Sequence, residues 1–122
     1  MSRRSTSGSG LDPKASLAAE INRLKETYAR ALPDRLATLE ALWHDVRAGD
    51  RRPDELEPLY RAAHSLTGSG ATFGYERVSV SARALELYLQ PLITGASVLT
   101  QTHVDKISEL LDALTRAAET SG

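Results

Sequence analysis

Hydrophobic residues recur along most of the chain at the three- and four-residue spacing of amphipathic helices. The first series follows Asp12-Pro13, an N-cap residue with proline at the first helical position. It continues in the same phase beyond Pro33, so we expect one helix kinked at Pro33, with two tightly joined helices as the alternative. Ala48-Gly49-Asp50 would end it with a C-cap glycine. The apolar positions are Leu17, Ile21, Leu24, Tyr28, Leu32, Leu36, Leu39, Trp43 and Val46.

A second series begins after the predicted turn Arg51–Asp54, where Asp54 can cap the following helix. Pro58 lies close enough to the start of this helix to be tolerated. Gly74 is expected to end it. The positions that cluster on one side, at 100° per residue, are Leu56, Leu59, Tyr60, Ala63, Leu66, Gly70 and Phe73.

Two further helices complete the pattern. The third is predicted from Tyr75 to about Gln90, where Pro91 and Gly95 end it. The fourth starts at Thr100 or Thr102, with Asp105 as a capping-box-like acid three residues after Thr102, and it frays from Ala117 onward. Its inward positions are Val104, Ile107, Leu110, Leu111 and Leu114. With no convincing strand, the fold expected is all-α: an antiparallel up-and-down four-helix bundle with an additional or kinked N-terminal helix.

Composition and charge narrow the class of protein. The 122 residues suffice for one domain, which we expect over residues 11–119, after a disordered tail of Ser, Gly and Arg at 1–10. There is no cysteine, which excludes disulfides and thiolate metal sites. The net charge of −1 comes from interspersed acids and bases, so nothing in the sequence suggests a nucleic-acid footprint. No apolar run approaches the roughly 20 residues of a membrane span, and no signal-peptide pattern appears. We therefore expect a cytoplasmic protein.

His64 is the residue with the clearest chemical potential. It points about 100° from the centre of the apolar cluster, at the boundary between core and solvent. An imidazole has a pKa near 6.5, so at neutral pH much of it is unprotonated and able to attack phosphorus. Gly68, one turn on in the same sector, leaves room for a docking protein, whereas Gly70 points to the core and permits close helix packing. An ordinary surface histidine is the alternative interpretation.

Other kinds of site are less well supported. His44, His64 and His103 are far apart in sequence and form no HxxxH or HExxH pattern, so a zinc site is not expected. There is no glycine-rich phosphate loop with lysine. Ser65 and Ser69 lack the surroundings of a catalytic serine.

The segment Ala63–Gly74, AHSLTGSGATFG, resembles the phosphoacceptor motif of histidine-containing phosphotransfer (HPt) domains. In looser form the resemblance extends from Leu32-Pro33 through Gly49-Asp50 and the helix ending Leu85-Glu86 to Leu110–Leu114, which is nearly the whole chain apart from the tail. It implies a four-helix bundle that carries a phosphoryl group on His64, at Nε2, between receiver-domain aspartates of a two-component phosphorelay. The phosphate environment and partner-docking residues would be Arg61, Thr67, Gly68, Ser69 and Ala71.

The resemblance also implies the partners. These are receiver domains of response regulators or of a hybrid histidine kinase, which bring their own magnesium, so no cofactor or metal is expected on this chain. The protein would be a monomeric carrier without kinase activity, and it would bind neither nucleic acid nor membrane. A histidine-kinase dimerisation hairpin is disfavoured, because Ser65-Leu66 follows the histidine in place of an acid and a nearby proline.

One position departs from the family pattern. Thr67 stands where HPt domains usually have lysine, so it provides no positive charge near the phosphoryl group. Arg61, Arg77 and Arg83 are the candidates to compensate, and the sequence does not distinguish among them. The missing lysine supports a second hypothesis, a binding module with the HPt fold that sequesters a receiver or another signalling partner without carrying phosphate.

Overall fold

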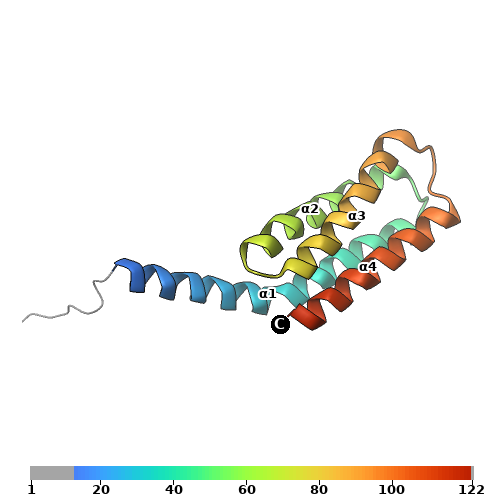
Figure 1. Ribbon diagram of the computed structural model, residues 1–122. Coiled ribbons are helices and arrows are strands. Elements are labelled where there is room, and N and C mark those ends of the chain that lie inside the picture. Colours follow the sequence, from blue (N-terminus) through green and yellow to red (C-terminus); the bar gives the residue numbers. More distant parts are fainter. Residues whose placement is uncertain (1–12, 122) are drawn as a thin grey trace, which may run out of the picture. The chain divides into compact units, whose positions relative to one another are not determined.

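The computed structural model describes residues 13–121 and consists of helices joined by short turns (Figure 1). No residue between Pro13 and Ser121 is in a strand, which confirms the all-α prediction. The tail expected at residues 1–10 lies outside the described residues. The elements are α1 (Pro13–Ala48), the 3-10 helix η2 (Pro53–Leu56), α2 (Glu57–Thr72), α3 (Glu76–Gly95) and α4 (Gln101–Ser121).

Helix α1 runs through Pro33 without a break, so the alternative of two separate helices is wrong. The chain nevertheless divides into two compact units between Ala31 and Leu32, two residues before this proline. In its described part, the first unit is a single stretch of α1. Its apolar residues Leu17, Ile21 and Leu24 are exposed to solvent.

The second unit packs the remainder of α1 with α2, α3 and α4 around one apolar core, as the helical periodicity predicted. Trp43 is buried in it, and its indole Nε1 donates a hydrogen bond of 3.0 Å to the Ser108 hydroxyl, joining α1 to α4. The fully buried leucines include Leu39, Leu56, Leu59, Leu66, Leu85, Leu89 and Leu114.

The close contact between α2 and α3 depends on two glycines. A Cβ on Gly70 would lie 3.1 Å from the backbone nitrogen of Ser79 and 3.1 Å from the carbonyl oxygen of Tyr75, so a larger residue would have to push the two backbones apart by a few tenths of an ångström. Gly74 has a φ of +84°, a conformation that favours glycine and that reverses the chain at the end of α2. The roles predicted for Gly70 and Gly74 are confirmed.

Three predicted helix ends are wrong. The predicted end of α3 near Gln90 is wrong, because a proline this near the end removes only one backbone hydrogen bond and the helix passes through Pro91; it ends at Gly95, the second residue predicted to stop it. Helix α4 continues beyond Ala117, which is buried, so the predicted fraying there does not occur. Asp54, expected to cap α2 directly, lies inside η2.

The start of α4 follows one of the two predicted alternatives. The Thr100 hydroxyl accepts a 3.3 Å hydrogen bond from the His103 backbone, and the His103 Nδ1 accepts a 3.1 Å bond from the Thr100 backbone. This is a capping box with histidine in the usual place of glutamate. The alternative cap at Thr102 with Asp105 is wrong, since Asp105 accepts from the Gln101 side chain instead.

Candidate functional site

His64 lies near the middle of α2 with its side chain 68% exposed, in agreement with the predicted position at the edge of the core. Tyr60, one turn earlier, stacks on the imidazole with the ring centroids 6.2 Å apart and the planes 18° from parallel. The histidine is thus open to solvent while one face of its ring is held by an aromatic neighbour.

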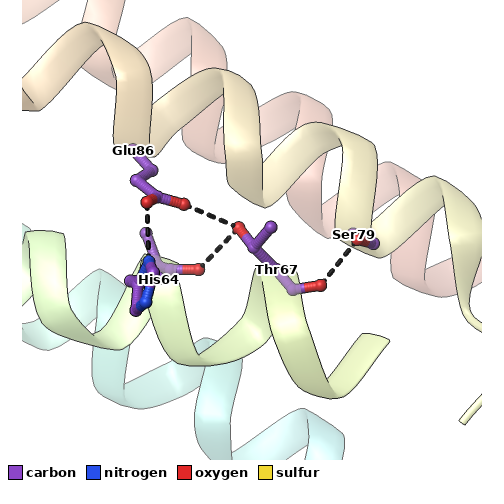
Figure 2. Close-up of polar contacts among 5 residues, drawn as sticks. His64, Thr67, Ser79 and Glu86 are labelled. Atoms are coloured by element: carbon purple, nitrogen blue, oxygen red, sulfur yellow. Dashed lines mark hydrogen bonds and ion pairs between the residues drawn. The ribbon is translucent and has the colours of Figure 1, made fainter. Parts of the chain in front are cut away.

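The edge of the ring is held by a residue of α3. Figure 2 shows Glu86 above His64, with its Oε2 atom 2.6 Å from the imidazole Nδ1. A carboxylate only accepts hydrogen bonds, so the tautomer that satisfies this contact carries its proton on Nδ1. Nε2 then bears the free electron pair, and the contact fixes the direction in which it points.

Thr67 holds the other oxygen of the same carboxylate. Its hydroxyl lies 3.1 Å from Glu86 Oε1 and 3.1 Å from the Ala63 carbonyl oxygen, so one proton is shared between two acceptors (Figure 2). The Glu86 side chain is only 10% exposed, and a buried carboxylate without partners would be costly. His64 and Thr67 together give both of its oxygens a partner.

A further hydrogen bond sets the alignment of the two helices beside this group. The Ser79 hydroxyl of α3 donates to the Thr67 carbonyl oxygen of α2 at 2.6 Å (Figure 2). Because α2 and α3 are antiparallel, this contact and the one between His64 and Glu86 fix the helix pair at two points about 10 Å apart along α3. Glu86 is therefore held opposite His64 by the packing of the bundle.

The predicted environment residues are only partly gathered around His64. Gly68 and Ala71 are exposed on the same side of α2, and a Cβ on Gly68 would meet no atom within 4 Å. Ser69 lies about 140° around the helix from His64, on a different face. Arg61 is on the histidine side, but its guanidinium pairs with Glu57 at 3.1 Å.

The other two arginines considered as replacements for the lysine differ in their contacts. Arg77 donates to the Thr120 hydroxyl at the far end of α4, so its side chain is engaged elsewhere. Arg83 is exposed on α3, one turn before Glu86, and forms no ion pair with another described residue.

Comparison with known proteins identifies the family. The Hpt domain model matches residues 23–119, which is most of the chain. The chain belongs to the Hpt domain family. A 70-residue stretch, 57% of the chain, is 30% identical to the chemotaxis protein CheA of Rhizobium meliloti (strain 1021). That stretch covers 9% of CheA, so the similarity concerns a small part of that relative. No solved structure gives a significant match.

The sequence analysis did not predict Glu86 as a site residue of this Hpt domain. One signal was present: beyond its first turn, α3 contains no other acidic residue, and Glu86 directly follows the buried Leu85. Its partner His64 is 22 residues away, so the pairing depends on how α2 and α3 align.

The described residues were also examined for metal-ligand groups and for membrane-spanning helices. Among residues 13–121, no three His, Cys, Asp or Glu side chains are grouped so that they could hold a metal ion. Over the same residues, no helix combines the length and apolar character needed to cross a bilayer.

Proposed function

We propose that this Hpt domain carries a phosphoryl group on Nε2 of His64, accepting it from the aspartyl phosphate of one receiver domain and passing it to an aspartate of another. The observation that supports this most directly is the contact of 2.6 Å between Nδ1 and Glu86, which leaves Nε2 as the free nitrogen of an exposed ring. Phosphoryl transfer requires little covalent chemistry from the carrier beyond a positioned nucleophile.

The reaction balances with these groups. Nε2 attacks phosphorus and an N–P bond forms, while the bond between phosphorus and the aspartyl oxygen breaks and releases the donor carboxylate. The ring keeps its Nδ1 proton and becomes positively charged, and the adjacent Glu86 carboxylate stabilises that charge. In the onward step an oxygen of the acceptor aspartate attacks phosphorus, and the N–P electron pair returns to Nε2.

Thr67, which stands in place of the family lysine, is compatible with this proposal because its hydroxyl binds Glu86. A lysine at position 67 would place a positive charge beside the carboxylate, whereas the Thr67 hydroxyl binds Oε1 without neutralising it. The Thr67 hydroxyl thus helps to hold Glu86 beside the imidazolium that forms during transfer. Positive charge for the phosphoryl oxygens would come from the receiver with its bound magnesium, and Arg83, exposed on α3, is the candidate on this chain.

Phosphotransfer from a labelled receiver tests the proposal. A receiver domain from the same genome, phosphorylated on its aspartate, should label this protein with acid-labile, base-stable phosphate. His64→Gln should abolish the label, while His44→Gln, which changes an exposed histidine of α1, should leave it unchanged. Circular dichroism of both variants should match the parent protein.

Two results would reject the proposal. Persistent labelling of His64→Gln would place the phosphate on another residue. Binding of receivers without labelling by any of them would favour the alternative, a binding module with the Hpt fold that does not carry phosphate.

A further inference from the structure

The first unit presents an apolar stripe that the phosphotransfer site does not use. Leu17, Ile21 and Leu24 lie along one side of α1 and are 61%, 41% and 42% exposed. Helix α1 begins at Pro13, whereas the family match begins at residue 23, so much of this stretch is an addition to the Hpt domain. Large apolar side chains aligned on an exposed helix indicate a surface that is covered by a partner.

The spacing of these residues specifies the kind of partner. The steps of four and three residues place Ile21 at position a of a heptad and Leu17 and Leu24 at position d; the neighbouring a positions are Lys14 and the buried Tyr28, so the seam comprises three apolar residues. A β-branched residue at a with leucine at d favours a parallel pair of helices over larger assemblies. Three of the four outward positions of the same stretch are polar, namely Asn22, Arg23 and Glu26, and the fourth is Ala19.

The charges beside the stripe distinguish parallel from antiparallel pairing. In this register Glu20 occupies position g and Lys25 the following position e. In a parallel, in-register pair, Glu20 of each copy faces Lys25 of the other, which gives two ion pairs related by symmetry. In an antiparallel pair, g faces g and e faces e, so Glu20 would face Thr27 and Lys25 would face Ala18.

Both charged residues are available for such a contact. Lys25 forms no ion pair with another residue among 13–121. Glu20 pairs with Arg23 of its own helix, but both side chains are at least half exposed. An exposed pair of this kind contributes little to stability, so it competes only weakly with an intermolecular one.

We propose that this stretch of α1 forms a parallel, in-register two-stranded coiled coil with a second copy of the chain. The seam has few apolar layers and buries less than the roughly 1,200 Å² of a stable interface, so the dimer is weak and forms only as the protein concentration rises. A weak dimer of this kind differs from the monomer expected from the sequence, although the carrier reaction itself needs no dimer. It concerns the first unit and is independent of the chemistry at His64.

Cysteine cross-linking in the full chain tests the pairing directly, because the natural sequence contains no cysteine. Leu24→Cys places a thiol at a seam position where the two copies meet at the same residue. Asn22→Cys, two residues away on the outer face, is the matched control. Under mild oxidation, Leu24→Cys should form a covalent dimer several-fold faster than Asn22→Cys, and increasingly so at higher concentration.

Charge reversal then tests the orientation in the Leu24→Cys protein. Lys25→Glu places Glu20 opposite a glutamate and should slow cross-linking several-fold, whereas adding Glu20→Lys should restore it. Equal cross-linking of Leu24→Cys and Asn22→Cys would overturn the proposal, as would failure of the double reversal to restore the rate. Preferential cross-linking between mixed Ile21→Cys and Leu24→Cys chains would indicate an antiparallel pair and would also overturn it. Circular dichroism shows whether each variant retains its helix.

Discussion

The imidazole Nδ1 of His64 and the Oε2 atom of Glu86 lie 2.6 Å apart although they belong to different helices. Neither helix alone would fix which ring nitrogen is free, because the tautomer depends on the acceptor that faces Nδ1. Which imidazole nitrogen of His64 is free therefore depends on the packing of α2 against α3. This relationship leads to the first prediction.

Replacing Glu86 should slow phosphotransfer without unfolding the bundle. Glu86→Gln keeps an oxygen that can accept from Nδ1 but removes the negative charge, and we expect roughly a tenfold lower rate, since a hydrogen bond to a charged group contributes about 1.5–3 kcal/mol. Glu86→Ala removes both and should be slower still. Nitrogen chemical shifts of the imidazole should show the Nδ1-protonated tautomer in the parent and a loss of that preference in Glu86→Ala. An unchanged tautomer in Glu86→Ala would contradict the role given to this carboxylate.

Removing the hydroxyl of Thr67 should affect both stability and transfer. Thr67→Val leaves Glu86 Oε1 without its partner, and we expect a loss of about 1–3 kcal/mol in the free energy of unfolding together with slower transfer. Thr72→Val is the control, because Thr72 bonds only the Gly68 carbonyl of its own helix. Urea denaturation should show the larger loss for Thr67→Val. Equal losses would mean that the bond to Glu86 contributes nothing.

Restoring the family residue at the same position gives a separate prediction. Thr67→Lys removes the hydroxyl that binds Glu86 Oε1 but adds positive charge near the phosphoryl group, so it should lengthen the lifetime of the phosphohistidine even where the rate of labelling falls. The measurements are the decay of the labelled protein and its rate of labelling. No change in either would show that Arg83 or the receiver already supplies this charge, and Arg83→Gln in both backgrounds separates these two sources.

Replacing Gly68 or Gly70 of α2 with alanine should change the stability of the protein in opposite directions. Gly68→Ala has open space and should stabilise the helix by about 0.5–1 kcal/mol. Gly70→Ala would press a methyl group against the backbone of Ser79 and Tyr75 and should cost about 1–3 kcal/mol. Thermal unfolding of the two variants tests the difference in sign.

A larger side chain at Gly68 tests access instead of stability. Gly68→Gln should retain the fold but slow labelling by a receiver, because the side chain would stand one turn from His64 on the exposed side. Gly68→Ala serves as its reference. If Gly68→Gln is labelled as fast as Gly68→Ala, the space beside the histidine is not needed for docking.

The capping box that Thr100 and His103 form at the start of α4 should contribute to stability. His103→Ala removes the acceptor for the Thr100 backbone and should destabilise the protein by about 0.5–1 kcal/mol. His103→Glu should retain the box and add a favourable interaction with the helix dipole, giving a protein at least as stable as the parent. A His103→Glu variant as unstable as His103→Ala would argue against the cap.

Much of the fold was predictable because helical periodicity is local. The burial of Trp43 and the packing at Gly70 both follow from which side of a helix a residue occupies. The end of α3 was not predictable in this way. Pro91 is a strong local signal for a helix end, but Leu92 and Ile93 beyond it are half-buried, and their packing extends the helix.

The site was less predictable, because half of it depends on contacts distant in sequence. His64 could be selected from its motif and its angular position. Glu86 could not, since its partner Thr67 is 19 residues away and the pairing requires the alignment set by the close crossing at Gly70 and the bond from Ser79. From the sequence, Thr67 could be interpreted only as the loss of the positive charge of the family lysine. The structure shows its hydroxyl bound to Glu86, the carboxylate that faces the histidine.

The exposure of His64 has a consequence for the direction of signalling under the proposed function. Its side chain is 68% exposed on a convex helix, and no segment among residues 13–121 covers it. Such a carrier holds its phosphoryl group where any suitable partner can withdraw or return it. The net direction of phosphoryl transfer then depends on the abundance of the partners and on the free energy of their phosphorylation. Under the proposed function, the protein would be a reversible store of phosphoryl groups without a preferred direction of transfer.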